Sequence, residues 1–221
     1  HVVGATADRR GWTGYIGGDG FPHLSINNTL NVNALDVKSL DARITDGQLH
    51  HCVMTYDGSS TPAGVVFYVD GVLQTNQTVL NSLAATSVST GTLQIGIWGS
   101  SGLLPVSGMP RQISLFSAVL NAGQVASLYA GGIPPDVASL GIASLLSYWK
   151  IDATDTAETN GFVDYGPGGF DGTAQNGLDL SPLGDLLVRG STDWDTLSPG
   201  GDNSPLISAG YGQKPFYPTL G

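Results

Sequence analysis

Hydrophobic and polar residues alternate along residues 49–56, and β-branched and aromatic residues fill residues 65–69. Alternation with a period of two is typical of a half-buried strand. A loop rich in Gly, Ser and Pro separates the two segments at residues 58–62. Asp70 and Gly71 follow as a two-residue turn of the kind that needs positive φ at both positions. The pattern therefore predicts antiparallel β structure.

The same kind of alternation predicts further strands along the chain. A hairpin is expected from residues 12–16 and 23–26 around a glycine-rich turn, and other strands at residues 30–37, 92–98, 111–117 and 146–152. The polar residues 76–90 are interpreted as a long connection. One short helix is predicted after Asn121 as its N-cap, because apolar residues recur at helical spacing up to Tyr129 and two glycines follow.

Residues 48–73 carry a family resemblance. They read Gln-Leu-His-His-Cys-Val-Met-Thr-Tyr-Asp-Gly, a loop, and then Tyr-Val-Asp-Gly. This arrangement resembles the laminin-G-like, concanavalin A-like jelly-roll family, and residues 113–129 match its strand followed by a short helix. The resemblance implies an all-β fold: a concanavalin A-like antiparallel β-sandwich with one short helix. An acidic pair that the family usually places before this strand is replaced by Arg111 and Gln112.

A second block extends the resemblance to residue 178. Leu-Tyr-x-Gly-Gly-Ile-Pro is followed by Tyr148-Trp149-Lys150 and later by Asp-Gly-Thr. This tandem is similar to the one in structural proteins of tailed bacterial viruses. We therefore expect one laminin-G-like domain over residues 1–178, shortened at its front end because the family's first strands are not found.

Residues 179–221 have a different pattern. Gly, Pro, Ser and Asp dominate, and no hydrophobic period survives. Composition alone predicts a disordered tail. The scattered aromatics support a second interpretation, an extended C-terminal arm that contacts a partner through Trp194, Tyr211, Phe216 and Tyr217. Both interpretations stay open at this point.

Composition narrows the function classes. The 221 residues carry a net charge of −10 with only 8 Lys and Arg, which argues against nucleic-acid binding through phosphate contacts. No apolar run reaches the length of a membrane helix, so no membrane partner is expected. The lone Cys52 cannot form an internal disulfide and is interpreted as a small buried residue in a strand.

The chemistry-bearing residues do not form a recognisable catalytic set. Glu158, the only glutamate, lies in a polar loop, and Asp193 and Asp195 lie in the tail, away from any predicted strand. No glycosidase carboxylate pair is therefore predicted, and we expect the protein not to be an enzyme. His50 and His51 are neighbours on a strand and point to opposite faces, so they do not share a metal ion.

Metal ions and glycans are the two classes of small ligand that the sequence leaves to consider. No metal site or cofactor is predicted, although Ca²⁺ stays an alternative, with Asp152 and Asp155, or Asp164 and Asp171, as contributors. For a glycan, Trp98 beside Ser100 is the best-placed aromatic, and Trp12 is second. The competing interpretation packs both tryptophans against the other sheet.

Two functions follow as hypotheses. The first is a non-enzymatic structural protein on a virion surface, a head decoration, fibre or tail component that contacts other virion proteins or copies of itself and grips host-surface glycans. The second is a carbohydrate-binding module of a secreted or cell-surface, extracellular protein.

Overall fold

A computed structural model describes residues 2–3, 10–95, 110–150, 161–173, 186–189 and 194–197 of the chain. The chain divides into two compact units. The first contains residues 1–110 and 114–148, and the second contains residues 111–113 and 149–221. The predicted domain boundary at residue 178 stays a prediction.

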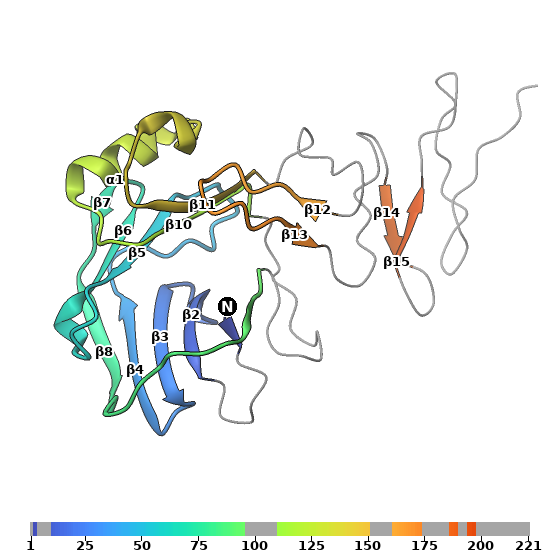
Figure 1. Ribbon diagram of the computed structural model, residues 1–221. Coiled ribbons are helices and arrows are strands. Elements are labelled where there is room, and N and C mark those ends of the chain that lie inside the picture. The colour runs from blue at the N-terminus through green and yellow to red at the C-terminus, as the bar shows by residue number, and fades with distance from the viewer. Residues whose placement is uncertain are drawn as a thin grey trace, which may run out of the picture. The chain divides into compact units, whose positions relative to one another are not determined.

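A four-stranded antiparallel sheet forms one layer of the first unit (Figure 1). Its strands lie in the order β2-β3-β4-β8. They are β2 (Gly11–Ile16), β3 (Pro22–Thr29), β4 (Asn33–Ser39) and β8 (Asn76–Asn81). The predicted hairpin at residues 12–26 is confirmed by β2 and β3.

Strand β8 corrects the prediction of a long connection at residues 76–90. Residues 76–81 pair with β4 along its length, although most of their side chains are exposed. A strand at the edge of a sheet can be polar on both faces, because no second layer has to cover it. The absence of hydrophobic alternation therefore hid this strand from the sequence pattern.

A three-stranded sheet forms the second layer, with the order β5-β6-β7. Its strands are β5 (Cys52–Tyr56), β6 (Val65–Val69) and β7 (Val72–Leu73). The turn between β6 and β7 confirms the predicted geometry, because Asp70 has φ 50° and Gly71 has φ 76°. Strand β5 starts later than predicted, at Cys52, since the preceding His51 N–H donates to the Asp70 carboxylate at 2.9 Å.

The core between the two sheets follows from the alternation of side chains. Leu24 and Ile26 of β3 and Val37 of β4 meet Val65 and Phe67 of β6 in one buried cluster. Phe67 is completely buried. Burying such side chains contributes about 1.5–3 kcal/mol each, so this cluster holds the sandwich together.

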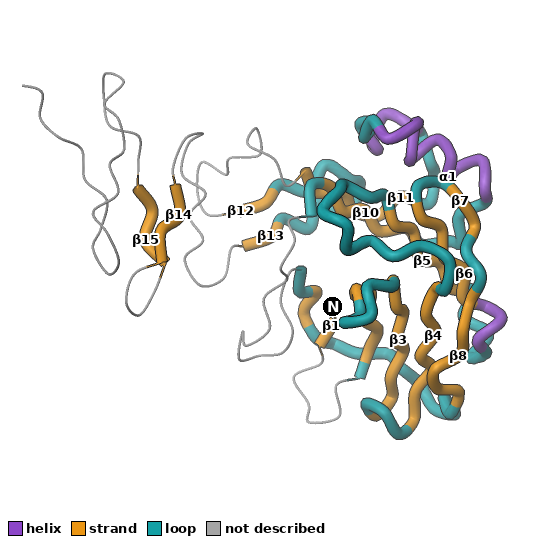
Figure 2. Tube along the Cα trace, turned by 180° about the vertical axis from the view of Figure 1, so that it is seen from behind, coloured by secondary structure: helices purple, strands orange, loops and turns teal. Residues whose placement is uncertain are grey.

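Helix α1 (Ala122–Tyr129) covers the other face of the β5–β6 layer (Figures 1 and 2). Its buried Val125 and Leu128 join Tyr148 in a second cluster, against which Val53 and Tyr68 pack. The predicted cap is confirmed: the Asn121 side chain accepts from Gln124 N–H, and the Gln124 side chain accepts from Asn121 N–H. This is a capping box, which satisfies two otherwise free donors.

The helix ends at Tyr129, just before the glycine pair, as predicted. Ala130 already has left-handed backbone angles, with φ 46° and ψ 36°. The described part of the chain also contains three short 3₁₀ turns: η1 (Pro62–Gly64), η2 (Ala130–Gly132) and η3 (Val137–Leu140). No helix in the described part of the chain is long and apolar enough to span a bilayer.

The remaining strands are short and pair two by two. β1 (Val2–Val3) pairs with β9 (Thr92–Leu93), and β10 (Gln112–Phe116) pairs with β11 (Leu145–Lys150). Of the predicted strand at residues 92–98, β9 is thus the only described part; Gln94 and Ile95 lie outside it and residues 96–98 lie outside the described residues. The predictions at residues 111–117 and 146–152 are confirmed as β10 and β11, with residues 151–152 outside the described residues.

In the second unit, β12 (Gly161–Phe162) pairs with β13 (Gly172–Thr173), and β14 (Leu186–Arg189) pairs with β15 (Trp194–Leu197). The β14–β15 pair lies where no period was found. Its presence corrects one expectation: Asp195 lies on a strand, although the sequence placed it away from any strand. Trp149 of β11 is buried.

Candidate ligand site

A row of polar side chains lies on the face of the four-stranded sheet opposite the hydrophobic core. In β3, Leu24 and Ile26 enter the core, so His23, Ser25 and Asn27 project from the opposite face. The register places Tyr15 of β2 beside His23. It also places Asp36 of β4 beside Ser25 and Lys38 beside His23. Strand pairing alone therefore gathers acidic, basic and hydroxyl groups at one place.

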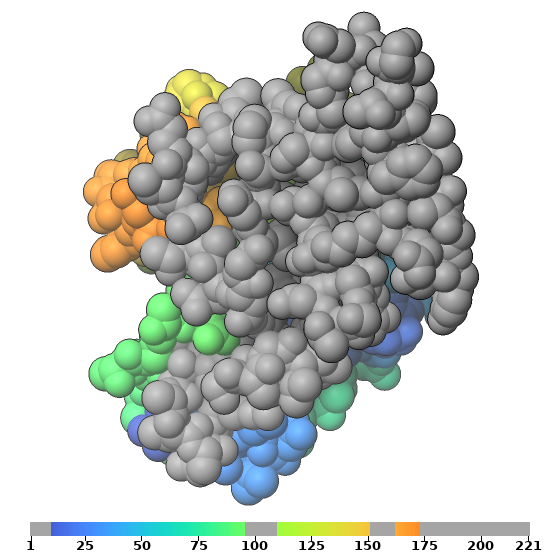
Figure 3. Space-filling model, turned by 90° about the vertical axis from the view of Figure 1, so that its right-hand side faces the viewer, coloured from blue at the N-terminus to red at the C-terminus, as the bar shows by residue number. Residues whose placement is uncertain are grey.

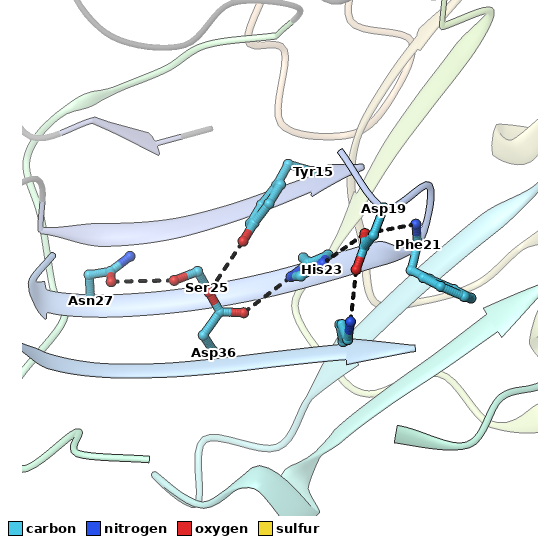
Figure 4. Close-up of polar contacts among 8 residues, drawn as sticks. Tyr15, Asp19, Phe21, His23, Ser25, Asn27 and Asp36 are labelled. Carbon is cyan, nitrogen blue, oxygen red and sulfur yellow. Dashed lines mark hydrogen bonds and ion pairs between the residues drawn. The ribbon is translucent and has the colours of Figure 1, made fainter. Parts of the chain in front are cut away.

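His23 stands at the centre of the resulting network (Figure 4). Its Nδ1 lies 3.4 Å from Asp36 Oδ1, and its Nε2 lies 3.4 Å from Asp19 Oδ1. The Tyr15 hydroxyl donates to Asp36 Oδ2 at 3.2 Å. The Tyr15 ring also stacks on the His23 imidazole, with centroids 4.7 Å apart. Burial, reinforced by the Asp36 carboxylate, raises the pKa of the Tyr15 phenol, so its hydroxyl stays a proton donor.

Asp19 closes the other end of this network. Lys38 Nζ donates to Asp19 Oδ2 at 2.8 Å, and Phe21 N–H donates to Asp19 Oδ1 at 3.2 Å. The hydrogen bond from Lys38 is the main cause that lowers the pKa of Asp19 to about 2. Asp19 therefore stays ionised and ties the β2–β3 turn to β4.

The network has little surface to offer a ligand. His23, Ser25 and Asn27 are 9%, 5% and 2% exposed. Both oxygens of Asp36 and both oxygens of Asp19 already have partners within the chain. His23 Nε2 is buried and makes only the 3.4 Å ion-pair contact with Asp19, without a hydrogen bond. Buried polar groups that bind one another, as the two carboxylates and their partners do, help to fix a fold. We therefore interpret this network as a lock that holds β2, β3 and β4 in register.

A second polar cluster lies where the segment before β5 meets the β6–β7 turn. His50 Nδ1 is 2.8 Å from Asp70 Oδ2, and its Nε2 is 2.9 Å from Asp46 Oδ1. Hydrogen bonds to Asp70 and then to Asp46 raise the pKa of His50. His51 instead stacks on Tyr129, with ring centroids 6.0 Å apart, and burial lowers the pKa of His51. The two imidazoles thus have separate surroundings, as their spacing predicts.

The described part of the chain holds no group of three or more His, Cys, Asp or Glu side chains with metal-site geometry. Of the residues considered for Ca²⁺, Asp164 accepts from Gly166 N–H and Phe170 N–H at 2.8 and 2.9 Å. Asp171 Oδ1 accepts from Asp164 N–H at 2.8 Å. These carboxylates organise a turn of the second unit. Asp152 and Asp155 lie outside the described residues.

An open cleft of about 480 Å³ lies in the first unit, between the loop after β5 and the segment after β8. Its volume is in the range of small-molecule sites. The segment after β8, green in the space-filling view, lies at the surface (Figure 3). The described lining consists of one aromatic residue, small residues and hydroxyls: Tyr56, Gly58, Ser60, Leu83, Ala84, Ala85, Thr86 and Ser87.

Hydrogen bonds hold both walls of this cleft. On one side, Ser60 N–H donates to Tyr56 Oη at 2.6 Å, and Ser60 has the left-handed φ of 58°. On the other, Asn28 Nδ2 donates to Thr86 O at 2.7 Å, and Asn33 Oδ1 accepts from Ala84 N–H at 2.8 Å. The two asparagines belong to β3 and β4, so the sheet itself positions this wall.

The structure places only part of the predicted site residues. Trp12 lies on β2 and is 36% exposed, and it does not line the cleft. Trp98 and Ser100 lie outside the described residues. Trp194 begins β15, of which the backbone alone is described, and Tyr211, Phe216 and Tyr217 lie outside the described residues. Their proposed roles stay predictions.

Sequence reasoning missed both the network and the cleft. The signal for the cleft was present in two segments of small and hydroxylated residues, residues 58–62 and 76–90, that were interpreted only as a loop and a connection. Nothing in a sequence period says that these loops meet. The network needs the register of three strands, which the pattern did not supply.

Comparison with protein families agrees with this two-sheet architecture. The sequence model of the concanavalin A-like lectin/glucanases superfamily matches residues 2–126. The chain belongs to this superfamily, and its fold is the concanavalin A-like β-sandwich. Searches of curated proteins and of solved structures gave no match. The family is consistent with a carbohydrate-binding or structural role.

Proposed function

We propose that the chain is a carbohydrate-binding module and that the cleft between the β5 loop and the segment after β8 holds the sugar. The observation that carries this proposal is an open cleft of about 480 Å³, lined by hydroxyls and a tyrosine, in a member of a lectin-containing superfamily. The site is accessible without rearrangement of the sheets.

The chemistry of the lining suits a sugar ring. A pyranose presents hydroxyls at its rim and C–H groups on its faces. Ser60, Thr86 and Ser87 supply hydroxyls in the cleft, and Ala84 and Ala85 supply apolar contact. Ligand sites commonly combine such an apolar surface with a few placed polar groups.

The cleft is a more suitable site than the polar network. A ligand on the network has to displace existing partners of Asp19 and Asp36, and each broken bond to a buried polar group costs about 1–3 kcal/mol. In the cleft, Ser60 is exposed and its backbone is already held by Tyr56. Binding there keeps the internal hydrogen bonds of the protein intact.

Binding without catalysis is the activity we propose. Glycoside hydrolysis in its usual form needs two carboxyl groups on either side of the scissile bond. No Asp or Glu is among the described residues that line the cleft. The lining can therefore hold a sugar, and the described side chains offer no acid for its leaving group.

A glycan array with the purified chain tests this proposal. The change Ala85→Leu fills the cleft and is expected to weaken retention of the bound glycan about tenfold or more, because the ring and the added side chain need the same space. Ala126→Leu, an equal change on the exposed face of α1, is the matched control. Equal retention by both variants, or no glycan bound by the unchanged chain, would contradict the proposal.

The setting that we propose for this module is the surface of a viral particle. This rests on the resemblance of the Tyr148-Trp149-Lys150 block to structural proteins of tailed bacterial viruses. The C-terminal residues 179–221 then contact other virion proteins or copies of the chain through Trp194, Tyr211, Phe216 and Tyr217.

Density-gradient sedimentation of the native source, with peptide mass spectrometry, tests this setting. Co-migration with virus-sized particles at a constant ratio to the major capsid protein supports a virion component. Migration as a small free species removes the virion setting and leaves an extracellular binding module as the proposal.

A further inference from the structure

The charge of the cleft gives information about its ligand. The chain has 26 ionisable Asp, Glu, Lys and Arg residues, 18 acidic plus 8 basic. None of them is among the described residues that line the cleft. The described lining also contains no histidine.

The hydrogen-bonding groups of the cleft are therefore hydroxyls and backbone groups. Tyr56 Oη accepts from Ser60 N–H, and Thr86 Oγ1 accepts from Val88 N–H at 3.2 Å. Each of these hydroxyls still has its proton to donate. Within the described chain, the Ser60 and Ser87 hydroxyls have no partner. Four residues that carry a hydroxyl thus line the cleft, and hydroxyls suit a ligand that both donates and accepts hydrogen bonds.

An anionic ligand does not fit this lining. A carboxylate or sulfate that gives up part of its water to enter an open cleft needs a cation or several N–H donors in exchange. The described lining offers no cation, and the net charge of −10 repels anions from the protein as a whole. A neutral sugar has no such requirement.

The geometry of Ser60 suggests that its hydroxyl is placed for this ligand. A serine with φ of 58° holds a conformation that costs L-residues roughly 1–2 kcal/mol. The short bond from Ser60 N–H to Tyr56 Oη keeps it there. Strained backbone held by a neighbouring group is common at ligand sites.

We propose that the cleft selects neutral sugars and rejects sialylated, sulfated and uronic-acid sugars. This inference rests on the proposed function, because it concerns the ligand of the same cleft. Its physical basis is a hydrogen-bond set made of hydroxyls without charge. Affinity is consequently independent of salt, since screening acts on charges.

The test uses pairs of glycans that differ only in an anionic group, in array and calorimetric formats. We expect binding of the neutral member, at least about tenfold weaker binding of the anionic member, and less than about twofold change in affinity between about 50 and 500 mM NaCl. Preference for the anionic member, or affinity that falls about tenfold with salt, overturns the inference while the proposed function holds. Binding of neither member overturns both.

A charge-gain variant sharpens this test. Ala85→Lys places a cation in the cleft and is expected to admit the anionic member with an affinity that falls as salt rises. Val88→Lys adds the same charge to the same segment, at an exposed residue that does not line the cleft, and is expected to change neither preference. Equal behaviour of the two lysine variants contradicts the inference, because the effect then comes from net charge alone.

Discussion

Two polar regions of the same unit differ in one property, the state of their hydrogen-bonding groups. The network around His23 contains four other ionisable side chains, Tyr15, Asp19, Asp36 and Lys38, yet both of its carboxylates already have partners and its central strand is nearly inaccessible. In the cleft around Ser60 the polar side chains of the described lining are all hydroxyls, and two of these hydroxyls have no partner within the described chain. A high number of ionisable side chains in one place therefore does not identify a ligand site. Accessible hydrogen-bonding groups without a partner in the protein are the better indication of a ligand site.

The largest expected effect on stability comes from the removal of Asp36, the central acid of the network. Asp36→Ala removes the oxygen that accepts from the Tyr15 hydroxyl and the carboxylate that contacts His23 Nδ1, and is expected to lower the free energy of unfolding by about 2–3 kcal/mol. Urea unfolding measures the loss. Asp36→Asn keeps an oxygen acceptor for Tyr15, so a loss about half as large is expected.

The same variants should leave glycan affinity unchanged under conditions where they are folded. If Asp36→Asn binds glycan several-fold more weakly than the unchanged chain, the network is part of the ligand site. The claim that the polar network is structural and that the cleft alone binds the glycan is then wrong.

A substitution in the cleft is expected to have the opposite effect: weaker glycan binding without a loss of stability. Ser60→Gly removes a hydroxyl but suits the left-handed backbone, so we expect about fivefold weaker glycan binding and a gain in the free energy of unfolding of up to about 1 kcal/mol. Ser60→Ala removes the same hydroxyl without relieving the backbone and serves as the matched variant. Calorimetry and urea unfolding give the two quantities. A destabilised Ser60→Gly with unchanged affinity would make Ser60 a structural residue.

The smallest expected effect concerns pH. The pKa of His50 is raised above the ordinary 6.5 in the folded chain, so its contribution to stability is fully present below pH 6.5 and is lost as pH rises through the folded pKa. We expect a contribution of about 1 kcal/mol or less. The lowered pKa of His51 acts on the other side, and destabilises the fold as pH falls below 6.5.

Comparison of the unchanged chain with His50→Gln isolates this effect. The difference in urea midpoint between the two chains should shrink from pH 6 to pH 9. Glycan affinity should stay constant over the same range, because the described lining of the cleft contains no Asp, Glu, His, Cys or Lys. A constant difference in midpoint shows that the charge of His50 does not contribute.

The sequence-based predictions were correct where residues close in the chain determine the local structure. The turn at Asp70 and Gly71, the strand at Val65–Val69 and the Asn121 cap were predicted because their cause lies within a few residues. The boundary of β5 was wrong because Asp70, a distant residue, takes the His51 N–H.

Long-range pairing explains what was missed. Edge strand β8 has polar residues on both faces, so it shows no period. The contact between His23 and Asp36 depends on the register of β3 with β4. The cleft depends on the packing of two sheets that brings Ser60 near Thr86. A period in one segment contains no information on any of these three features.

Titration of the ¹⁵N-labelled chain with a neutral glycan selected on the array, followed by NMR, tests the central claim most directly. The account predicts that the amide signals of Ser60, Ala85 and Ser87 shift with one common dissociation constant, while those of His23 and Asp36 stay in place. Shifts confined to His23, Asp36 and their neighbours would contradict it and make the polar network the binding site.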